Sequence, residues 1–199
     1  MDKVNINEII GKETERIWNG RAVEDDRVYI STSDARSVLA RGIRYFLGDT
    51  AVWLPEYERI AEWLADNKGR GLLCIGNCGR GKTVICQRVL PVIFKHWHRL
   101  IMNTVTMTEL NERFDEFARY KIISLDDVGV EPVANKFGEK HSYFSEIVDL
   151  AERKQKLLII STNLNDKELE SLYGIRTIDR LKALAKVVVF NGESLRGLK

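Results

Sequence analysis

The stretch GNCGRGKT, at residues 76–83, constrains the fold more than any other part of the sequence. It matches G-x-x-x-x-G-K-[ST] in full, follows the apolar run of residues 72–75 and precedes a stretch with helical spacing. Three glycines within six residues indicate a backbone shape that side chains would not allow. A strand, a glycine loop and a helix in this order predict a phosphate-binding loop in an α/β domain.

The residues of this loop are expected to bind a nucleoside triphosphate together with its metal ion. Backbone N–H groups converge on the phosphate oxygens, and the start of the following helix adds the positive end of its dipole. We expect Lys82 to contact the β and γ phosphates, and the Thr83 hydroxyl to bind Mg²⁺. The residues predicted to bind ATP are Gly76, Asn77, Cys78, Gly79, Arg80, Gly81, Lys82 and Thr83.

Two acidic residues, Asp126 and Asp127, end the apolar run of residues 122–125. Ligands of open α/β sheets bind at the carboxyl ends of the strands, which is where these carboxylates are expected to emerge. Asp126 is therefore the candidate Mg²⁺ partner, and Asp127 the candidate base or water-orienting residue. An ordinary turn also ends in acidic residues, and the sequence leaves that alternative open.

A second polar cluster, Ser161, Thr162 and Asn163, follows the apolar run of residues 157–161. Asn163 is a candidate hydrogen-bond partner of the attacking water or of the γ-phosphate. It is also a candidate cap for the helix expected after Asn165, where Glu168 three residues on completes a capping pattern. The sequence does not decide between these two roles.

Five apolar runs alternate with helical stretches in the second part of the chain, which predicts a parallel sheet covered on both faces. The expected strands are residues 72–75, 100–105, 122–125, 157–161 and 187–190. Residues 1–70 lack a strand pattern and show helical spacing behind Asp34 or Ser33 and again behind Pro55. We expect a helical extension over residues 1–70 and an ATPase domain over residues 71–199. Pro91 is expected to end or kink the helix after the glycine loop.

The composition limits where in the cell the protein is expected. Net charge is only +2, and no stretch approaches the roughly 20 apolar residues that a membrane span requires. Residues 1–20 contain no apolar run of the kind found in secretory signals. Three cysteines in no zinc-like spacing fit a reducing compartment. The sequence therefore predicts a cytoplasmic protein without a membrane partner.

The motifs together resemble those of the bacterial replicative helicase loaders of the DnaC type and of transposition helper ATPases, a branch of the AAA+ ATPases. The resemblance covers residues 71–199 and rests on GNCGRGKT, ISLDDVG, STN, YGIRTIDRL and FNGESLR. It implies a P-loop NTPase with an AAA+ core, whose five-stranded parallel sheet has the order 5-1-4-3-2. It also implies that the C-terminal helical lid of many AAA+ proteins is missing.

The resemblance assigns further roles to single residues. It implies that Asn163 is a γ-phosphate sensor, that Arg176 is an arginine finger toward a neighbouring subunit, and that Arg196 is a second sensor. From the residues alone, a helix-surface position for Arg176 and a solvated tail for Arg196 stay open as alternatives, while Arg180 is better explained as one half of a helix-surface ion pair. Asp127 stands where most AAA+ ATPases have Glu, which favours modest turnover.

The partners that this resemblance implies are single-stranded DNA, a replicative helicase or a transposase, and further copies of the chain assembling on ATP and DNA. Two segments are candidate DNA contacts: the basic and aromatic run at residues 95–99, and residues 103–117 by resemblance. The leading hypothesis is an ATPase that loads a replicative helicase. The alternatives are a transposition helper and a binding module switched slowly by ATP, while a small-molecule kinase fits the inserted strand and Asn163 less well.

Overall fold

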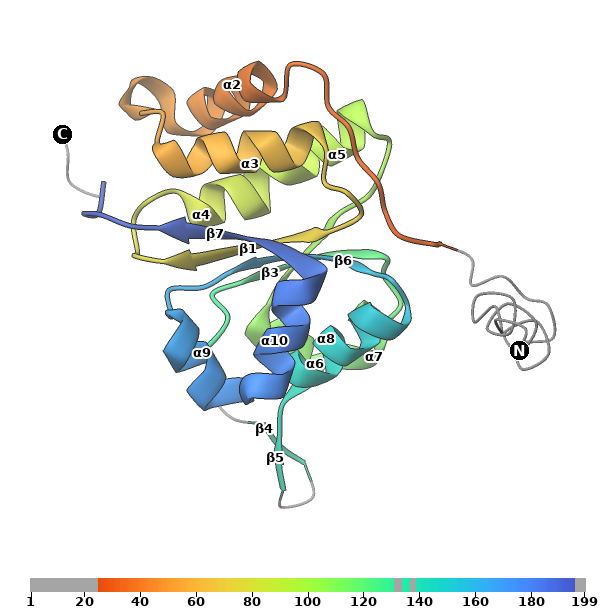
Figure 1. Cartoon of the computed structure of the whole chain (residues 1–199). Helices are drawn as coiled ribbons and strands as arrows, with labels where there is room; N and C mark the ends of the chain where they lie inside the picture. The colour runs from red at the N-terminus through yellow and green to blue at the C-terminus, as the bar shows by residue number, and fades with distance from the viewer. Residues whose placement is uncertain (1–24, 131–133, 137–138, 196–199) are drawn as a thin grey trace, which may run out of the picture.

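A five-stranded, all-parallel sheet forms the centre of the molecule, with helices on both of its faces (Figure 1). The computed structural model describes residues 25–130, 134–136 and 139–195. The strand order is β2-β3-β6-β1-β7, which is the predicted order 5-1-4-3-2 read from the other edge. The strands are β1 (Gly71–Gly76), β2 (Asn103–Thr106), β3 (Ile122–Asp126), β6 (Leu157–Ser161) and β7 (Ala185–Phe190).

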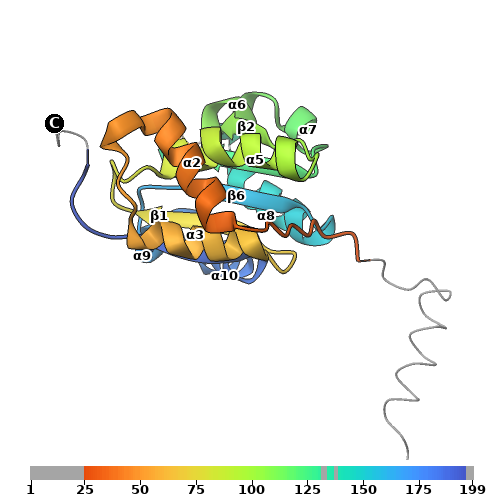
Figure 2. The ribbon, with the colours of Figure 1, turned by 90° about the horizontal axis from the view of Figure 1, so that it is seen from above.

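One layer of helices comes from the residues before β1 and from those that follow the glycine loop (Figures 1 and 2). It contains α2 (Ala35–Leu47), the short η1 turn (Gly48–Thr50), α3 (Pro55–Ala65), α4 (Lys82–Val84) and α5 (Leu90–Trp97). Buried side chains of α2 and α3 share one hydrophobic core with Leu72, Cys74, Val188 and Phe190 of the sheet. Helix α3 thus packs on β7, and α2 packs on α3 and on the helical turn that follows the glycine loop. The division of the chain at residue 70 stays a prediction.

The other layer covers the opposite face of the sheet. Its helices are α6 (Met107–Glu112), α7 (Phe114–Phe117), α8 (Tyr143–Arg153), α9 (Asp166–Tyr173) and α10 (Ile175–Leu184), and a hairpin of β4 (Ala134–Lys136) and β5 (Glu139–His141) precedes α8. Leu73 and Ile75 of β1 face this layer while Leu72 and Cys74 face the first, as the two-residue period of a strand requires. In the described parts of the chain, no helix is long and apolar enough to cross a membrane.

The helix after the glycine loop changes its winding before Pro91. A π-helical turn, η2 (Ile85–Val89), joins α4 to α5, and Pro91 occupies the first turn of α5. Proline has no N–H to donate within the helix, and the wider turn accommodates the missing hydrogen bond. The Ser124 hydroxyl also donates to the Cys86 carbonyl at 3.2 Å, which supports the widened turn from the neighbouring strand. The helix was predicted to end or kink at Pro91. It does not end there, because α5 continues to Trp97, and the irregularity is the π-helical turn just before Pro91.

Helix starts agree with the sequence in two cases and differ in a third. Pro55 opens α3 as predicted, and Asn165 forms a capping box with Glu168 at the start of α9. Asp34 does precede α2, but its side chain makes no capping hydrogen bond and its backbone is left-handed, with φ 52°.

The second strand begins later than predicted. It starts at Asn103 instead of residue 100, because Arg99 adopts a left-handed conformation, with φ 56°. The Leu100 N–H then bonds back to the Phe94 carbonyl at 3.0 Å, so residues 98–100 close α5 instead of extending along the sheet. Leu100 and Met102 pack against the core beside this helix end, whereas Ile101 is exposed.

Candidate nucleotide site

The glycine loop connects β1 to α4 in the shape that its composition predicts. Gly76, Gly79 and Gly81 have φ values of 110°, 77° and 86°, which residues with a side chain rarely adopt. Lys82 is the first residue of α4, so the loop ends at the N-terminus of a helical segment. The backbone therefore has the path of a phosphate-binding loop.

Lys82 is a buried cation without a carboxylate partner in the described part of the chain. Its residue is only 5% exposed, and its ammonium donates to the carbonyls of Gly76 at 2.8 Å and Asn77 at 2.7 Å, and to Asn163 Oδ1 at 3.0 Å. Burial lowers the pKa of Lys82 below its ordinary value. None of the three acceptors carries a charge, and a bound phosphate would place its negative charge directly against this ammonium.

Hydroxyl groups surround the carboxylate of Asp126 at the end of β3. The Thr83 hydroxyl donates to Asp126 Oδ1 at 3.2 Å, and the Ser161 hydroxyl, on the neighbouring strand β6, donates to the same oxygen. Mg²⁺ in nucleotide sites commonly takes one or two protein oxygens and completes its shell with phosphate and water. Thr83 and Asp126 fit such an ion. The described residues contain no cluster of three or more His, Cys, Asp or Glu side chains that could bind a metal ion.

Asn163 links Lys82 to Asp127. Its Nδ2 donates to Asp127 Oδ1 at 3.3 Å, while its Oδ1 accepts from the Lys82 ammonium. Asp127 itself is left-handed, with φ 50°, and this turns the chain away from the sheet immediately after Asp126. The cap of α9 is Asn165, so the capping alternative for Asn163 does not hold.

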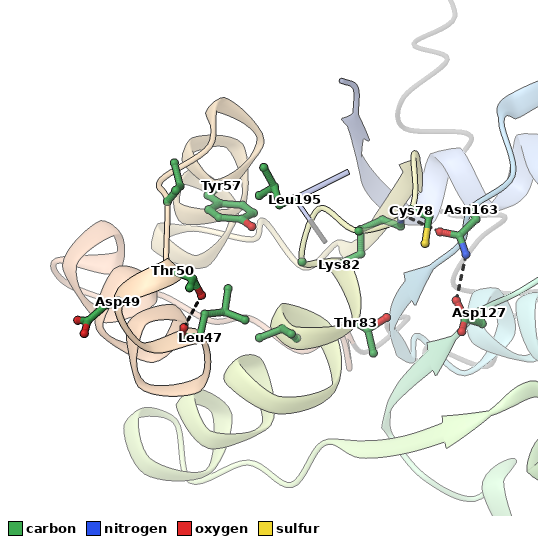
Figure 3. A pocket seen from close by; sticks show the side chains of 14 residues that line it. Leu47, Asp49, Thr50, Tyr57, Cys78, Lys82, Thr83, Asp127, Asn163 and Leu195 are labelled. Atoms are coloured by element: carbon green, nitrogen blue, oxygen red, sulfur yellow. Dashed lines mark hydrogen bonds between the residues drawn. The ribbon is translucent and has the colours of Figure 1, made fainter. Parts of the chain in front are cut away.

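These groups form one end of a pocket of about 600 Å³ (Figure 3). Asp127 and Asn163 lie on one side and Lys82 and Thr83 lie in the middle, while the other side is mostly apolar but also carries Asp49 and Thr50. The apolar end is lined by Leu47, Val52, Tyr57, Val84 and Leu195. A phosphate chain matches the polar end and a flat heterocycle matches the apolar end. None of Leu47, Tyr57 and Leu195 was predicted from the sequence to line this site.

The remaining predicted residues lie elsewhere. Arg80 belongs to the loop, but its guanidinium is buried against Glu56 on α3. Arg176 is exposed at the start of α10 and does not line the pocket of its own chain. Arg180 forms ion pairs with Asp149 and Glu152, as the sequence reading favoured. Arg196 lies outside the described residues.

Of the candidate DNA contacts at residues 95–99, four are exposed at the end of α5: Lys95, His96, Trp97 and Arg99. Trp97 is 51% exposed and Ile101, just beyond, is 76% exposed. His98 instead turns inward, with its Nε2 2.8 Å from the Thr32 hydroxyl.

Comparison with solved structures identifies the same fold in DNA replication proteins. The DnaC helicase loader matches with a TM-score of 0.52 and 18% identity, over 89% of this chain and 99% of the loader. DnaI matches with a TM-score of 0.51 and 19% identity, over 80% of this chain and 87% of DnaI. AMPPCP-bound DnaA from Aquifex aeolicus matches with a TM-score of 0.52 and 14% identity, over 73% of this chain and 50% of the DnaA chain.

No protein-family model and no curated protein matches the sequence. At 14–19% identity, the solved structures show the fold alone. Within that limit they confirm the predicted resemblance in fold to the helicase loaders, and the sheet has the predicted strand order.

Proposed function

We propose that this chain is a cytoplasmic, Mg²⁺-dependent ATPase of DNA replication that loads a replicative helicase onto single-stranded DNA. The observation that carries the proposal is the meeting of Lys82, Thr83, Asp127 and Asn163 in one pocket, with Asp126 hydrogen-bonded to Thr83 beside them. The helicase loaders among the solved structures with this fold support the replication role.

Each polar group has a role in this mechanism. The loop amides and Lys82 bind the phosphates, and Thr83 and Asp126 hold Mg²⁺, which when bound supplies positive charge against the phosphate oxygens. Asp127 accepts a hydrogen bond from the attacking water and orients it. Asn163 fixes Asp127 through the 3.3 Å hydrogen bond and stands beside Lys82, where the γ-phosphate is expected.

Arg176 completes the site from a neighbouring copy of the chain. Its exposure, and its position outside its own pocket, suit a group that reaches across a subunit contact. Ile175 beside it is 73% exposed and offers apolar surface for that contact. An arginine supplied in trans stabilises charge on the transferring phosphoryl group and makes hydrolysis depend on assembly.

Single-stranded DNA is assigned to the exposed end of α5. Trp97 offers a ring for base stacking, and Lys95 and Arg99 offer charge for the phosphates. The four buried residues within 103–117 all belong to the core: Val105, Met107, Leu110 and Phe117. The residues of that segment open to DNA are therefore its exposed polar ones, such as Thr104 and Thr108.

A single-turnover ATPase assay with and without single-stranded DNA tests the proposal, with Lys82→Ala as the inactive reference. Losing a charged hydrogen bond of about 2 to 3 kcal/mol is expected to weaken ATP binding roughly 30- to 160-fold in that variant. We expect DNA to stimulate the wild-type protein, and Trp97→Ala to lose the stimulation while it keeps the basal rate.

Three results would redirect the proposal. A slow rate that DNA leaves unchanged favours the ATP-switched binding module. Stimulation by DNA together with capture of a transposase instead of a helicase favours the transposition helper. Equal ATP affinity in the wild-type protein and in Lys82→Ala would contradict the assignment of the nucleotide site to this loop.

A further inference from the structure

Arg80 occupies a variable position of the phosphate loop, yet its side chain is turned away from the pocket and into the protein. Its Nε donates to Glu56 Oε1 at 2.8 Å, and its Nη2 lies 2.7 Å from the same oxygen. The side chains of Arg80 and Glu56 are only 10% and 8% exposed. A buried ion pair therefore joins the phosphate loop to the first turn of α3.

The same guanidinium also binds the segment that follows β7, residues 191–195. Its Nη1 donates to the Glu193 carbonyl at 3.1 Å. Gly192 lies against it so closely that a Cβ there would come within 2.9 Å of Nη1. Asn77 Nδ2 donates to the Gly192 carbonyl at 2.8 Å, and the Leu195 N–H donates to the Gly79 carbonyl at 3.0 Å. This C-terminal segment is thus tied to the loop at three points, and its last described residue, Leu195, lines the nucleotide pocket.

Tyr57, next to Glu56 on α3, holds the loop backbone itself. Its hydroxyl donates to the Arg80 carbonyl at 2.9 Å, and a Cβ on Gly81 would come within 2.5 Å of that hydroxyl. Burial raises the pKa of Tyr57 to about 12, so the hydroxyl keeps its proton at neutral pH. The Arg80–Gly81 peptide of the phosphate loop is therefore held from the side of α3.

The pair is poorly explained as a source of stability. Glu56 Oε2 is buried and has no hydrogen-bond partner among the described residues. Desolvating two charges offsets most of their attraction, and a well-packed apolar pair in the same place is usually as stable or more so. What an apolar pair does not supply is direction, because only a planar guanidinium with several donors joins a carboxylate and a carbonyl at once.

We propose that Arg80 is a positioning residue that holds the phosphate loop between α3 and the C-terminal segment. It sets the loop amides toward the phosphates and keeps Leu195 over the apolar end of the pocket. Affinity for the nucleotide then depends on a side chain that does not touch it. This inference rests on the proposed nucleotide site, and extends it to a coupling between that site and both helix α3 and residues 191–195.

The test replaces both charges with apolar side chains, in the double variant Glu56→Leu/Arg80→Met. We expect this variant to unfold at the same urea concentration as the wild-type protein, because no unpaired charge is left in the interior. We expect its dissociation constants for ATP and ADP to rise by the same factor, about tenfold or more, because the loop that both nucleotides share is displaced. In the nucleotide-free protein, the Leu195 amide is expected to exchange its hydrogen at least about tenfold faster, because its bond to Gly79 is loosened.

Lys82→Ala serves as the direct-contact comparison, since removing a charge near the γ-phosphate weakens ATP more than ADP. A stable double variant that keeps wild-type affinities and wild-type Leu195 exchange would overturn the proposal. If the double variant does not fold, Arg80→Lys decides, because one ammonium retains the charge opposite Glu56 but lacks the fork that also reaches Glu193. Unchanged Leu195 exchange in Arg80→Lys would equally overturn it. If the wild-type protein binds no ATP, the proposed function fails. The hydrogen exchange rate of the Leu195 amide still tests the role of Arg80 in that case.

Discussion

Asp126 accepts hydrogen bonds from the hydroxyls of Thr83 and Ser161, and an asparagine in its place keeps the oxygen that both use. We predict that Asp126→Asn binds ATP in metal-free buffer within about twofold of the wild-type protein, because the phosphate contacts remain. Mg²⁺-dependent hydrolysis is expected to fall about 100-fold or more, because a metal ion contributes several kcal/mol to the transition state. Isothermal titration and phosphate release measure the two quantities.

The matched control for this substitution is Asp66→Asn, an exposed carboxylate in the loop before β1 that only accepts the Lys68 N–H. It should leave both binding and hydrolysis unchanged. Wild-type hydrolysis in Asp126→Asn would mean that the metal is held by other groups.

His98 makes stability depend on pH. Burial lowers its pKa below the ordinary 6.5, and its ring bonds the Thr32 hydroxyl. The unfolded chain takes up a proton near pH 6.5 while the folded chain resists it, so stability is lost as pH falls below 6.5. We predict that, between about pH 7.5 and about pH 5.5, the wild-type protein loses more free energy of unfolding than His98→Gln. Urea denaturation at the two pH values measures this loss. The difference is bounded by about 1.4 kcal/mol per pH unit for one proton. Equal losses in the two proteins would rule out this contribution.

At the scale of elements, α2 crosses the π-helical turn η2 at a glycine. A Cβ on Gly42 would come within 2.5 Å of Val89 Cγ1, and Val89 is 1% exposed. Alanine in place of glycine favours the helix by about 1 kcal/mol, but overpacking a core contact costs about 1 to 3 kcal/mol. Because valine is stiff and already buried, we predict that Gly42→Ala lowers the free energy of unfolding by about 1 kcal/mol.

Val89→Ala checks the physical reason for this loss. On its own it leaves a cavity and destabilises the protein, but it also removes the methyl group that meets the new Cβ. In urea denaturation, the double variant should therefore lose less than the sum of the two single variants. Strictly additive losses would mean that the helices do not touch at Gly42.

At the scale of the whole molecule, the trans role proposed for the exposed Arg176 would make hydrolysis depend on assembly. We predict that Arg176→Ala keeps wild-type ATP affinity and loses about 10³- to 10⁵-fold in hydrolysis, the range known for arginine fingers. Hydrolysis per wild-type subunit should rise with protein concentration, because a single subunit has an incomplete site. Arg153→Ala, which removes another exposed helical arginine, is the matched control and should hydrolyse ATP normally.

Mixing two inactive variants separates this trans contact from an ordinary loss of activity. Lys82→Ala binds nucleotide poorly but still carries Arg176, so it should restore hydrolysis to Arg176→Ala subunits. Mixtures no more active than the sum of their parts, together with a rate independent of concentration, would exclude the trans arginine.

Much of the fold and of the phosphate end of the site followed from the sequence, because short-range rules specify them. The glycines allow the positive φ angles of the loop, Pro55 and Asn165 start helices, and Asp126 ends its strand at the edge where ligands bind. Each of these depends on residues within one turn or one strand. The sheet order came from the resemblance, since no local rule ranks five parallel strands in space.

Only the tertiary structure decided which distant residues meet the loop. Glu56 and Tyr57 lie more than 20 positions before the residues that they bind, and Leu195 lies 116 positions after Gly79. In the sequence Tyr57 is one more apolar residue of a helix, and the left-handed Arg99 that delays β2 leaves no pattern at all. Helical spacing identifies which face of a helix is buried. It does not identify what that face is buried against, because that is set by the packing of the whole core.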